Sequence, residues 1–294
     1  MRLQKRLCSA PMRSNLLALG AIGMWGALAA LGVALSHVPP FLLTGLGLLV
    51  GSLIALPLSR FQWALWRVPL PTLLLGVYGL FGFHFLLFVA LRHAPAVEAN
   101  LINYLWPLGM VVMAPLFLPA LRLRGAHVVA ALLGFAGAAV AILGRSGAGL
   151  DGMALEWHWG YLLALASAFV WSSYSLLTRR VPPFPTSAIG GFALVSGVLA
   201  LLCHAWLEPR VVLSGTDWAL IFLLGLGPLG GAFFLWDAAL KAGDPRRIGL
   251  LAFLTPLLST ALLVVLSGQP LRWSIALAAL MIVGAAVLGS RSGD

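Results

Sequence analysis

Ten long apolar runs divide this chain, and they restrict its fold more than any other feature. Most of the runs are close to the ~20 residues that a helix needs to cross the ~30 Å hydrocarbon core of a bilayer. Their apolar residues are continuous rather than alternating, which excludes the strand pattern of a transmembrane β-barrel. We therefore expect an all-α integral membrane protein with ten transmembrane helices, at about residues 16–35, 41–58, 72–91, 97–118, 128–143, 160–177, 187–206, 218–240, 248–266 and 274–289.

The composition agrees with a membrane location. Of the 294 residues, 61% are hydrophobic and 9% are charged, and the mean hydropathy is +1.02. A water-soluble protein of this composition would have too little polar surface to cover its apolar residues. The lipid bilayer is thus the first partner that we predict.

The 18 basic residues are distributed unevenly between the two sides of the expected helices. One side carries only Arg92, Arg145, Arg210 and Arg272, and all the others fall on the opposite side. Because positive charge accumulates in cytoplasmic loops, this distribution places the N and C termini in the cytoplasm. The net charge of +10 reflects the same bias, so we predict no nucleic-acid partner.

The chain also contains an internal duplication. Val-Pro-Pro-Phe occurs at 38–41 and again at 181–184, and Tyr-Leu-Trp-Pro-Leu at 104–108 is matched by Phe-Leu-Thr-Pro-Leu at 253–257. We interpret residues 14–144 and 159–290 as two repeats of five helices each. Since five is odd, the second repeat starts on the opposite side of the membrane and is inverted relative to the first. Inverted repeats are typical of secondary transporters that work by alternating access, and we expect a monomer to be sufficient for transport.

The fourth expected helix carries the densest group of polar and aromatic residues. At helical spacing, one stripe turned away from lipid would contain Asn100, Asn103, Pro107 and Met110. Pro107 cannot donate a backbone hydrogen bond, which leaves carbonyls available to other partners. The alternative is a kinked packing helix whose amides are satisfied within the protein. The residues that we predict to line a substrate site here are Asn103, Tyr104, Trp106 and Pro107.

Three other helices supply further candidates for this site. Tyr78 and His84 lie among phenylalanines of the third helix, and both need polar partners inside the protein or in a wet cavity. A hydrogen-bonded packing role for His84 stays open. Trp25 and Trp171 occupy equivalent points near the middle of the first helix of each repeat, far from the interfaces where indoles usually lie.

The membrane-embedded titratable residues are the candidates for a proton relay, namely His84, Glu98 and Asp237. For Asp237 we favour a simpler role as the partner of Lys241 one turn later. We find no metalloenzyme motif and no Ser/His constellation at useful spacing, so we predict no enzyme activity, no metal and no cofactor.

No Lys or Arg lies deep in any expected helix. A cavity lined by Trp, Tyr and Asn without strong charge suits a neutral or zwitterionic solute with an apolar or aromatic side chain. Sugar phosphates and nucleotide sugars are disfavoured, because phosphate recognition normally uses Arg or Lys. A proton-coupled exporter of cations or multiple drugs is the alternative, and it would need Glu98 to face the cavity.

The chain resembles the drug/metabolite transporter superfamily and its EamA domains, with ten expected helices and a proline of the fourth mirrored in the ninth. The run Asn103–Pro107 and Trp25 resemble in particular the aromatic amino acid exporters of that superfamily. This resemblance implies export of phenylalanine, tyrosine, tryptophan, methionine and threonine across a bacterial inner membrane. It places Trp25, Tyr78, His84, Tyr104, Trp106, Pro107 and Trp171 at the cavity. Because the second repeat has Phe253 and Thr255 in place of Tyr and Trp, we expect an asymmetric site.

Overall fold

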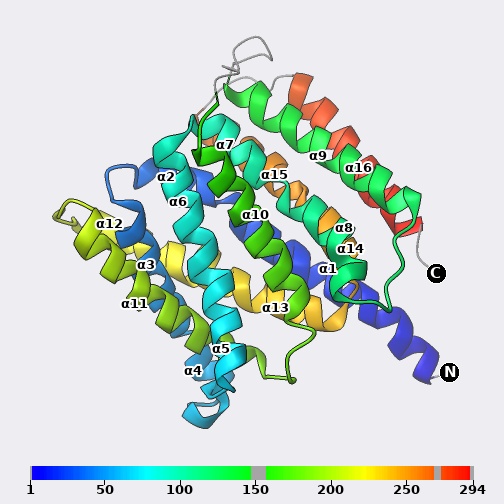
Figure 1. Ribbon diagram of the computed structural model, residues 1–294, viewed down its shortest axis with the longest axis horizontal. Helices are drawn as coiled ribbons and strands as arrows, with labels where there is room; N and C mark the ends of the chain where they lie inside the picture. The colour runs from blue at the N-terminus through cyan, green and yellow to red at the C-terminus, as the bar shows by residue number, and fades with distance from the viewer. Residues whose placement is uncertain (1, 147–156, 268–272, 292–294) are drawn as a thin grey trace.

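The computed structural model describes residues 2–146, 157–267 and 273–291, and within these ranges it contains helices and turns but no strand (Figure 1). The helices of the first half are α1 (Arg2–Gly26), α2 (Leu28–Ala34), α3 (Pro40–Ser52), α4 (Ala55–Leu58), α5 (Leu70–Val77), α6 (Phe83–His93), α7 (Ala96–Asn103), α8 (Trp106–Phe117) and α9 (Gly125–Ser146). Those of the second half are α10 (Gly160–Leu177), α11 (Ile189–Leu207), α12 (Gly215–Leu226), α13 (Ala232–Ala242), α14 (Pro245–Ala252), α15 (Leu254–Ser267) and α16 (Trp273–Arg291).

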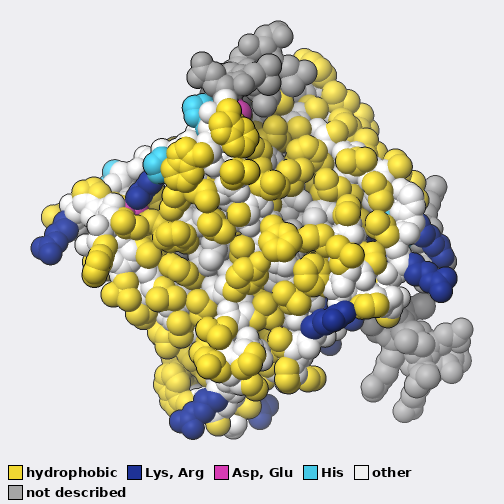
Figure 2. Space-filling model, in the orientation of Figure 1, with side chains coloured by type: hydrophobic (Ala, Val, Ile, Leu, Met, Phe, Trp, Pro, Cys, Tyr) yellow, Lys and Arg dark blue, Asp and Glu magenta, His cyan; other side chains and the backbone are white. Residues whose placement is uncertain are grey.

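Among the described residues, nine helical stretches are long and apolar enough to cross a membrane, and a shorter apolar helix covers Trp273–Gly289. Several of the nine combine two helices with a short break between them, as α1 with α2 and α7 with α8 do. Apolar side chains cover most of the visible face of the molecule, whereas Lys and Arg gather at its edges (Figure 2). This is the surface of an integral membrane protein, with an apolar belt and charged rims.

The breaks within the long helices recur at matching places in the two halves. A π-helical turn, η2 (Tyr78–Gly82), joins α5 to α6, and a second, η5 (Gly227–Gly231), joins α12 to α13. The α7–α8 break falls just before Pro107 and the α14–α15 break just before Pro256. Proline lacks the amide hydrogen that would continue the helical ladder, which accounts for the position of both breaks.

Helices from the two halves pack against each other throughout the bundle. The most extensive contacts join α9 to α16, α3 to α11 and α1 to α13, and the first of these pairs forms one edge of the molecule in Figure 1. Small residues allow the close approach: a Cβ added to Gly51 of α3 would lie 2.7 Å from the Gly230 Cα. Without a hydrophobic driving force between helices in lipid, such close backbone contacts are a main source of packing energy.

Candidate functional site

A cavity of about 500 Å³ lies among α1, α6, α7, α8, α10, α13 and α15. Its lining starts at Leu91, Ala96 and Val97, which flank the turn between α6 and α7, and reaches inward to Trp106 and Trp171. Much of the wall is aromatic, and the rings that line it belong to Trp25, Phe83, His84, Phe88, Tyr104, Trp106, Trp171 and Phe233. No Asp, Glu, Lys or Arg belongs to the lining within the described part of the chain.

Four indoles close the inner end of the cavity. Trp25, Trp106, Trp171 and Trp236 are at most 8% exposed. The ring centroids in each of the six pairs that they form are between 5.1 and 6.4 Å apart. The first three line the cavity, and Trp236 lies behind them. Most of the pairs are edge-to-face or tilted, the arrangements that the ring quadrupole favours.

Two of these indoles have polar partners that explain how they are tolerated far from the membrane interface. Trp25 Nε1 donates to the Pro228 carbonyl in the π-helical turn η5, at 3.1 Å, and Trp236 Nε1 donates to Ser175 Oγ at 3.1 Å. A buried indole N–H without a partner would be costly. The helix break at Pro228 and a serine of α10 therefore hold the indole cluster in place.

Besides His84 and Tyr104, the polar side chains of the cavity wall come from two helices. Helix α7 contributes Asn100 and Asn103, and the Ser167 hydroxyl of α10 donates to Asn103 Oδ1 at 2.7 Å. Helix α15 contributes three hydroxyl side chains, those of Thr255, Ser259 and Thr260. The part of the chain that the structure describes contains no cluster of three His, Cys, Asp or Glu side chains that could hold a metal.

The single stripe expected along the fourth helix is divided by the break before Pro107. Asn100 and Asn103 line the cavity, whereas Pro107 and Met110 are buried outside its lining. A Cβ added to Gly249 of α14 would meet both the Pro107 carbonyl and Met110 Cβ at 3.2 Å. Asn103, Pro107 and Met110 are buried, as expected for a stripe turned away from lipid, but only the part of the stripe on α7 reaches the cavity.

Tyr78 begins the π-helical turn η2 in the third span, and His84 lies just after this turn. His84 lines the cavity, and its Nδ1 donates to the Leu80 carbonyl at 2.6 Å. Tyr78 is not among the lining residues, and its hydroxyl lies 2.8 Å from Ser173 Oγ of α10. The structure thus places His84 with the aromatic wall and Tyr78 at the contact between two helices.

The remaining candidates for a proton relay lie outside the cavity lining. Glu98 is half-buried on α7. Asp237 Oδ2 accepts from Lys241 Nζ and from Thr186 Oγ1, both at 2.6 Å, which confirms the expected pair with Lys241. Lys241 Nζ also lies 3.8 Å from the centroid of the Phe184 ring. Asp237 is therefore engaged in a contact between α13 and the segment that precedes α11.

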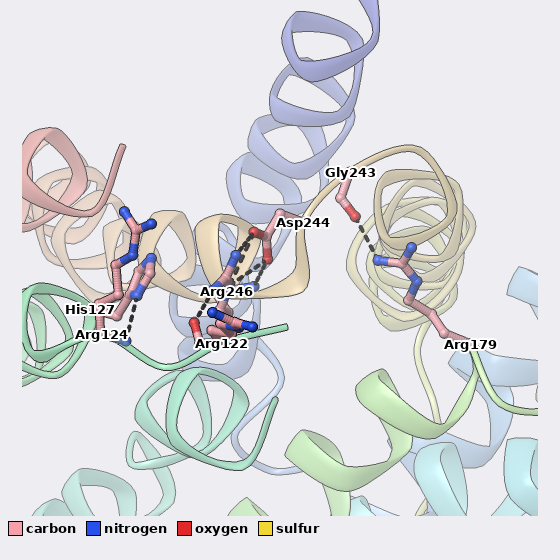
Figure 3. A network of polar contacts seen from close by, with 7 residues as sticks. All are labelled: Arg122, Arg124, His127, Arg179, Gly243, Asp244 and Arg246. Atoms are coloured by element: carbon pink, nitrogen blue, oxygen red, sulfur yellow. Dashed lines mark hydrogen bonds and ion pairs between the residues drawn. The ribbon is translucent and has the colours of Figure 1, made fainter. Parts of the chain in front are cut away.

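A network of arginine hydrogen bonds joins the ends of several helices (Figure 3). Asp244 accepts from the backbone and side-chain nitrogens of Arg246, whose guanidinium also donates to the Arg122 carbonyl. Arg179 donates to the Gly243 carbonyl at 3.0 Å. Burial opposes ionisation of Asp244, but the hydrogen bonds from Arg246 outweigh it and hold the pKa of this carboxyl below its ordinary value. The network links the α8–α9 loop and the end of α10 to the α13–α14 turn.

Sequence reasoning did not single out several of the residues that form the cavity. Phe83 and Phe233 looked like ordinary core residues, and Ser259 and Thr260 looked like isolated polar positions in an apolar helix. A signal for the hydroxyl residues was present in the duplication. Aligning Pro256 with Pro107 places three hydroxyl side chains opposite three apolar ones, namely Trp106, Met110 and Val111.

Comparison with known proteins identifies the kind of molecule that has this architecture. The model of the EamA-like transporter family matches the chain twice, at residues 12–143 and 158–291. The chain is 42% identical over 280 residues to a protein of Ancylobacter novellus named aromatic amino acid exporter YddG, covering 94% of this chain and 96% of that one. It is 28% identical over 203 residues to the protein of that name in Escherichia coli K12, with 68% of each covered.

Two further proteins are similar to this chain over most of its length. A probable amino-acid metabolite efflux pump of Salmonella typhimurium is 30% identical over 279 residues, with 88% of each chain covered. A crystal structure superimposes with a TM-score of 0.88 at 40% identity, covering 95% of this chain and 97% of that one. The apolar helices, the duplicated match and the closely similar solved structure lead to one conclusion: this chain belongs to the EamA-like transporter family.

Proposed function

We propose that this protein exports aromatic and other apolar amino acids across a bacterial inner membrane by alternating access. The observation that carries the proposal is the aromatic cavity without fixed charge, in a chain 42% identical to a protein named as an aromatic amino acid exporter. Its volume of about 500 Å³ falls in the range of small-molecule sites. Aromatic walls offer edge-to-face contacts to phenylalanine, tyrosine and tryptophan and apolar contacts to methionine. We propose that a monomer is sufficient for this transport.

The proposed architecture has ten transmembrane helices in two inverted repeats, residues 14–144 and 159–290. Its support is the exchange of equivalent helix contacts: α1 packs against α13 and α15, and α10 packs against α6 and α8. A twofold operation that converts one repeat into the other turns the first set of contacts into the second. Both π-helical turns and both proline breaks follow the same operation.

A cation placed over a phenylalanine ring also recurs in the two halves. Lys241 Nζ lies 3.8 Å from the Phe184 ring centroid, and the Arg92 guanidinium lies 5.5 Å from that of Phe41. Each phenylalanine ends one copy of the Val-Pro-Pro-Phe repeat, and each cation follows an Ala-Leu pair. Side chains of the two copies thus make the same contact, as an inverted repeat requires.

The distribution of basic residues supports cytoplasmic termini in this proposal. The α6–α7 turn, at the rim of the cavity, then lies on the periplasmic side. The indole cluster and the arginine network of Figure 3 lie between the cavity and the cytoplasm. In this orientation the cavity is accessible from the periplasm. The conformation then corresponds to the one that releases the transported amino acid outside the cell membrane.

The test is flux in reconstituted liposomes. Vesicles containing the protein should transport labelled phenylalanine, tryptophan and methionine faster than empty vesicles, and they should not transport a sugar phosphate. Phenylalanine flux no faster than in empty vesicles would refute the proposal. Repeating the assay with and without a pH gradient separates proton-driven export from uniport or exchange.

The alternative, a proton-coupled exporter of cations or multiple drugs, has less support from the geometry. Glu98 does not line the cavity, and one oxygen of Asp237 is paired with Lys241. This alternative predicts that Glu98→Gln abolishes efflux of a cationic dye while phenylalanine flux continues. Under our proposal, phenylalanine flux is the main activity of the wild-type protein, and it survives this substitution.

A further inference from the structure

The cavity wall on α15 differs in chemistry from the equivalent surface of the first repeat. On α8 the three positions carry Trp106, which lines the cavity, and Met110 and Val111, which are buried outside its lining. The positions that correspond to them on α15 carry Thr255, Ser259 and Thr260, and all three line the cavity. The second repeat thus places three hydroxyl side chains at the cavity wall where the first repeat has apolar ones.

Thr255 has an unusual position among these hydroxyl residues. It is 6% exposed, and its Oγ1 has no hydrogen-bond partner within the described part of the chain. A buried hydroxyl without a partner is costly, so its presence at a cavity wall calls for a ligand. It is also the second residue of α15, a helix of 14 residues that begins at the break after Phe253.

The start of α15 favours an anion as this ligand. The first turn of a helix carries a partial positive charge and amide hydrogens directed away from the helix body. Broken helices in transporters use this end to hold the carboxylate of a substrate. Within the described part of the chain no Lys or Arg lines the cavity, so a carboxylate bound there would depend on such neutral donors.

We propose that Thr255, at the start of α15, binds the carboxylate of the transported amino acid, so that the aromatic wall is left for its side chain. The inference deepens the function proposed above and rests on it. Under this proposal Thr255 of the second repeat orients the substrate, and the aromatic side chains of the cavity wall select the substrate's side chain. It also explains why the two copies differ at this position, because a tryptophan in place of Thr255 would occupy the space and remove the donor.

The experiment compares two threonine substitutions in the full-length protein reconstituted in liposomes. Thr255→Val keeps the shape of the side chain and removes the hydroxyl, and we expect it to raise the KM for phenylalanine by at least about tenfold, as for loss of a hydrogen bond to a charged group. Thr255→Ser keeps the hydroxyl and should restore a KM near that of the wild type. The matched control is Thr72→Val, because Thr72 is also a buried threonine without a hydrogen-bond partner in the described residues but does not line the cavity.

Inhibitors then identify the group that is bound. Phenethylamine, which has no carboxylate, should inhibit phenylalanine flux with the same inhibition constant in Thr255→Val and in the wild type. An increase in the phenethylamine inhibition constant as large as the increase in the phenylalanine KM would overturn the proposal in favour of an ammonium site, because both molecules carry an ammonium group.

The melting temperature in detergent monitors folding. Replacing a buried hydroxyl without a partner by a methyl group should leave this temperature unchanged or raise it, for both Thr255→Val and Thr72→Val. A phenylalanine KM in Thr255→Val that changes no more than in Thr72→Val overturns the inference and leaves the proposed function intact. Absence of phenylalanine flux in the wild type overturns both.

Discussion

Individual side chains in this protein have different roles according to what surrounds them. The indoles of Trp157 and Trp206 are exposed, in keeping with residues at the ends of membrane spans. Trp171, by contrast, contacts Trp25, Phe83 and Phe233 with ring centroids 5.4 to 5.7 Å apart. The same residue type is thus exposed at the end of a span at one position and part of the cavity wall at another.

This difference leads to a prediction for the cavity floor. Trp171→Ala should reduce phenylalanine kcat/KM by more than about tenfold, because it removes aromatic contacts worth roughly 0.5–1.5 kcal/mol each together with the apolar area of the ring. Flux in liposomes checks this expectation. Trp206→Ala is the control, since its side chain is 88% exposed and it should retain wild-type flux. Equal flux in the two variants would exclude Trp171 from the site.

At the scale of helices, glycine determines how closely the two halves approach. In helix α3, a Cβ on Gly51 would lie 2.7 Å from the Gly230 Cα and 2.8 Å from the Leu229 carbonyl oxygen, and backbone atoms cannot rotate away. Gly32 of α2 has no such neighbour within 4 Å. A side chain added at Gly51 would therefore clash with backbone atoms, whereas one added at Gly32 would not.

Gly51→Ala should destabilise the protein by about 1–3 kcal/mol, the usual cost of overpacking a close contact. We expect a lower melting temperature in detergent and less folded protein after purification. Gly32→Ala should leave the melting temperature unchanged or raise it, since alanine favours a helix more than glycine does. If both variants melted at the same temperature, the close contact between α3 and η5 would not contribute to stability.

At the scale of the whole molecule, the cavity and the arginine network belong to one conformation. Lining residues reach the α6–α7 turn, while the arginine network joins helices at the far end of the bundle. The alternating access proposed above requires this end to open, and its hydrogen bonds must then break. Under that proposal, the strength of the network sets part of the free-energy difference between the two conformations.

Asp244→Asn tests this role. The substitution keeps a capping side chain but removes the carboxylate that pairs with Arg246, so we expect hydrogen exchange in residues 118–124 and 244–248 to increase by roughly tenfold, as for a loss of about 1–2 kcal/mol. Because the pKa of Asp244 is lowered in the folded protein, its contribution is present above its ordinary value and is lost as pH falls through the lowered pKa. The protection factors of the wild-type amides, which are corrected for the intrinsic pH dependence of exchange, should therefore be constant near neutral pH and fall only below about pH 4.

Asp217→Asn is the control, because Asp217 caps α12 through Ser214 at the opposite end of the molecule. It should not alter exchange in residues 118–124. Unchanged exchange in Asp244→Asn would show that the network does not hold this end closed.

Continuous apolar runs of membrane-spanning length allow only helices in a bilayer, so the class of fold followed from the amino-acid sequence. Two of the helix breaks could also be predicted, because Pro107 and Pro256 cannot donate to the backbone ladder. Which side chains share the cavity depended on packing. Asn103 lines the cavity whereas Pro107, four residues later, packs against α14, and Trp236 joins the indoles of three other helices. Periodicity records local geometry, whereas a cavity arises from distant segments whose contacts depend on the packing of the whole bundle.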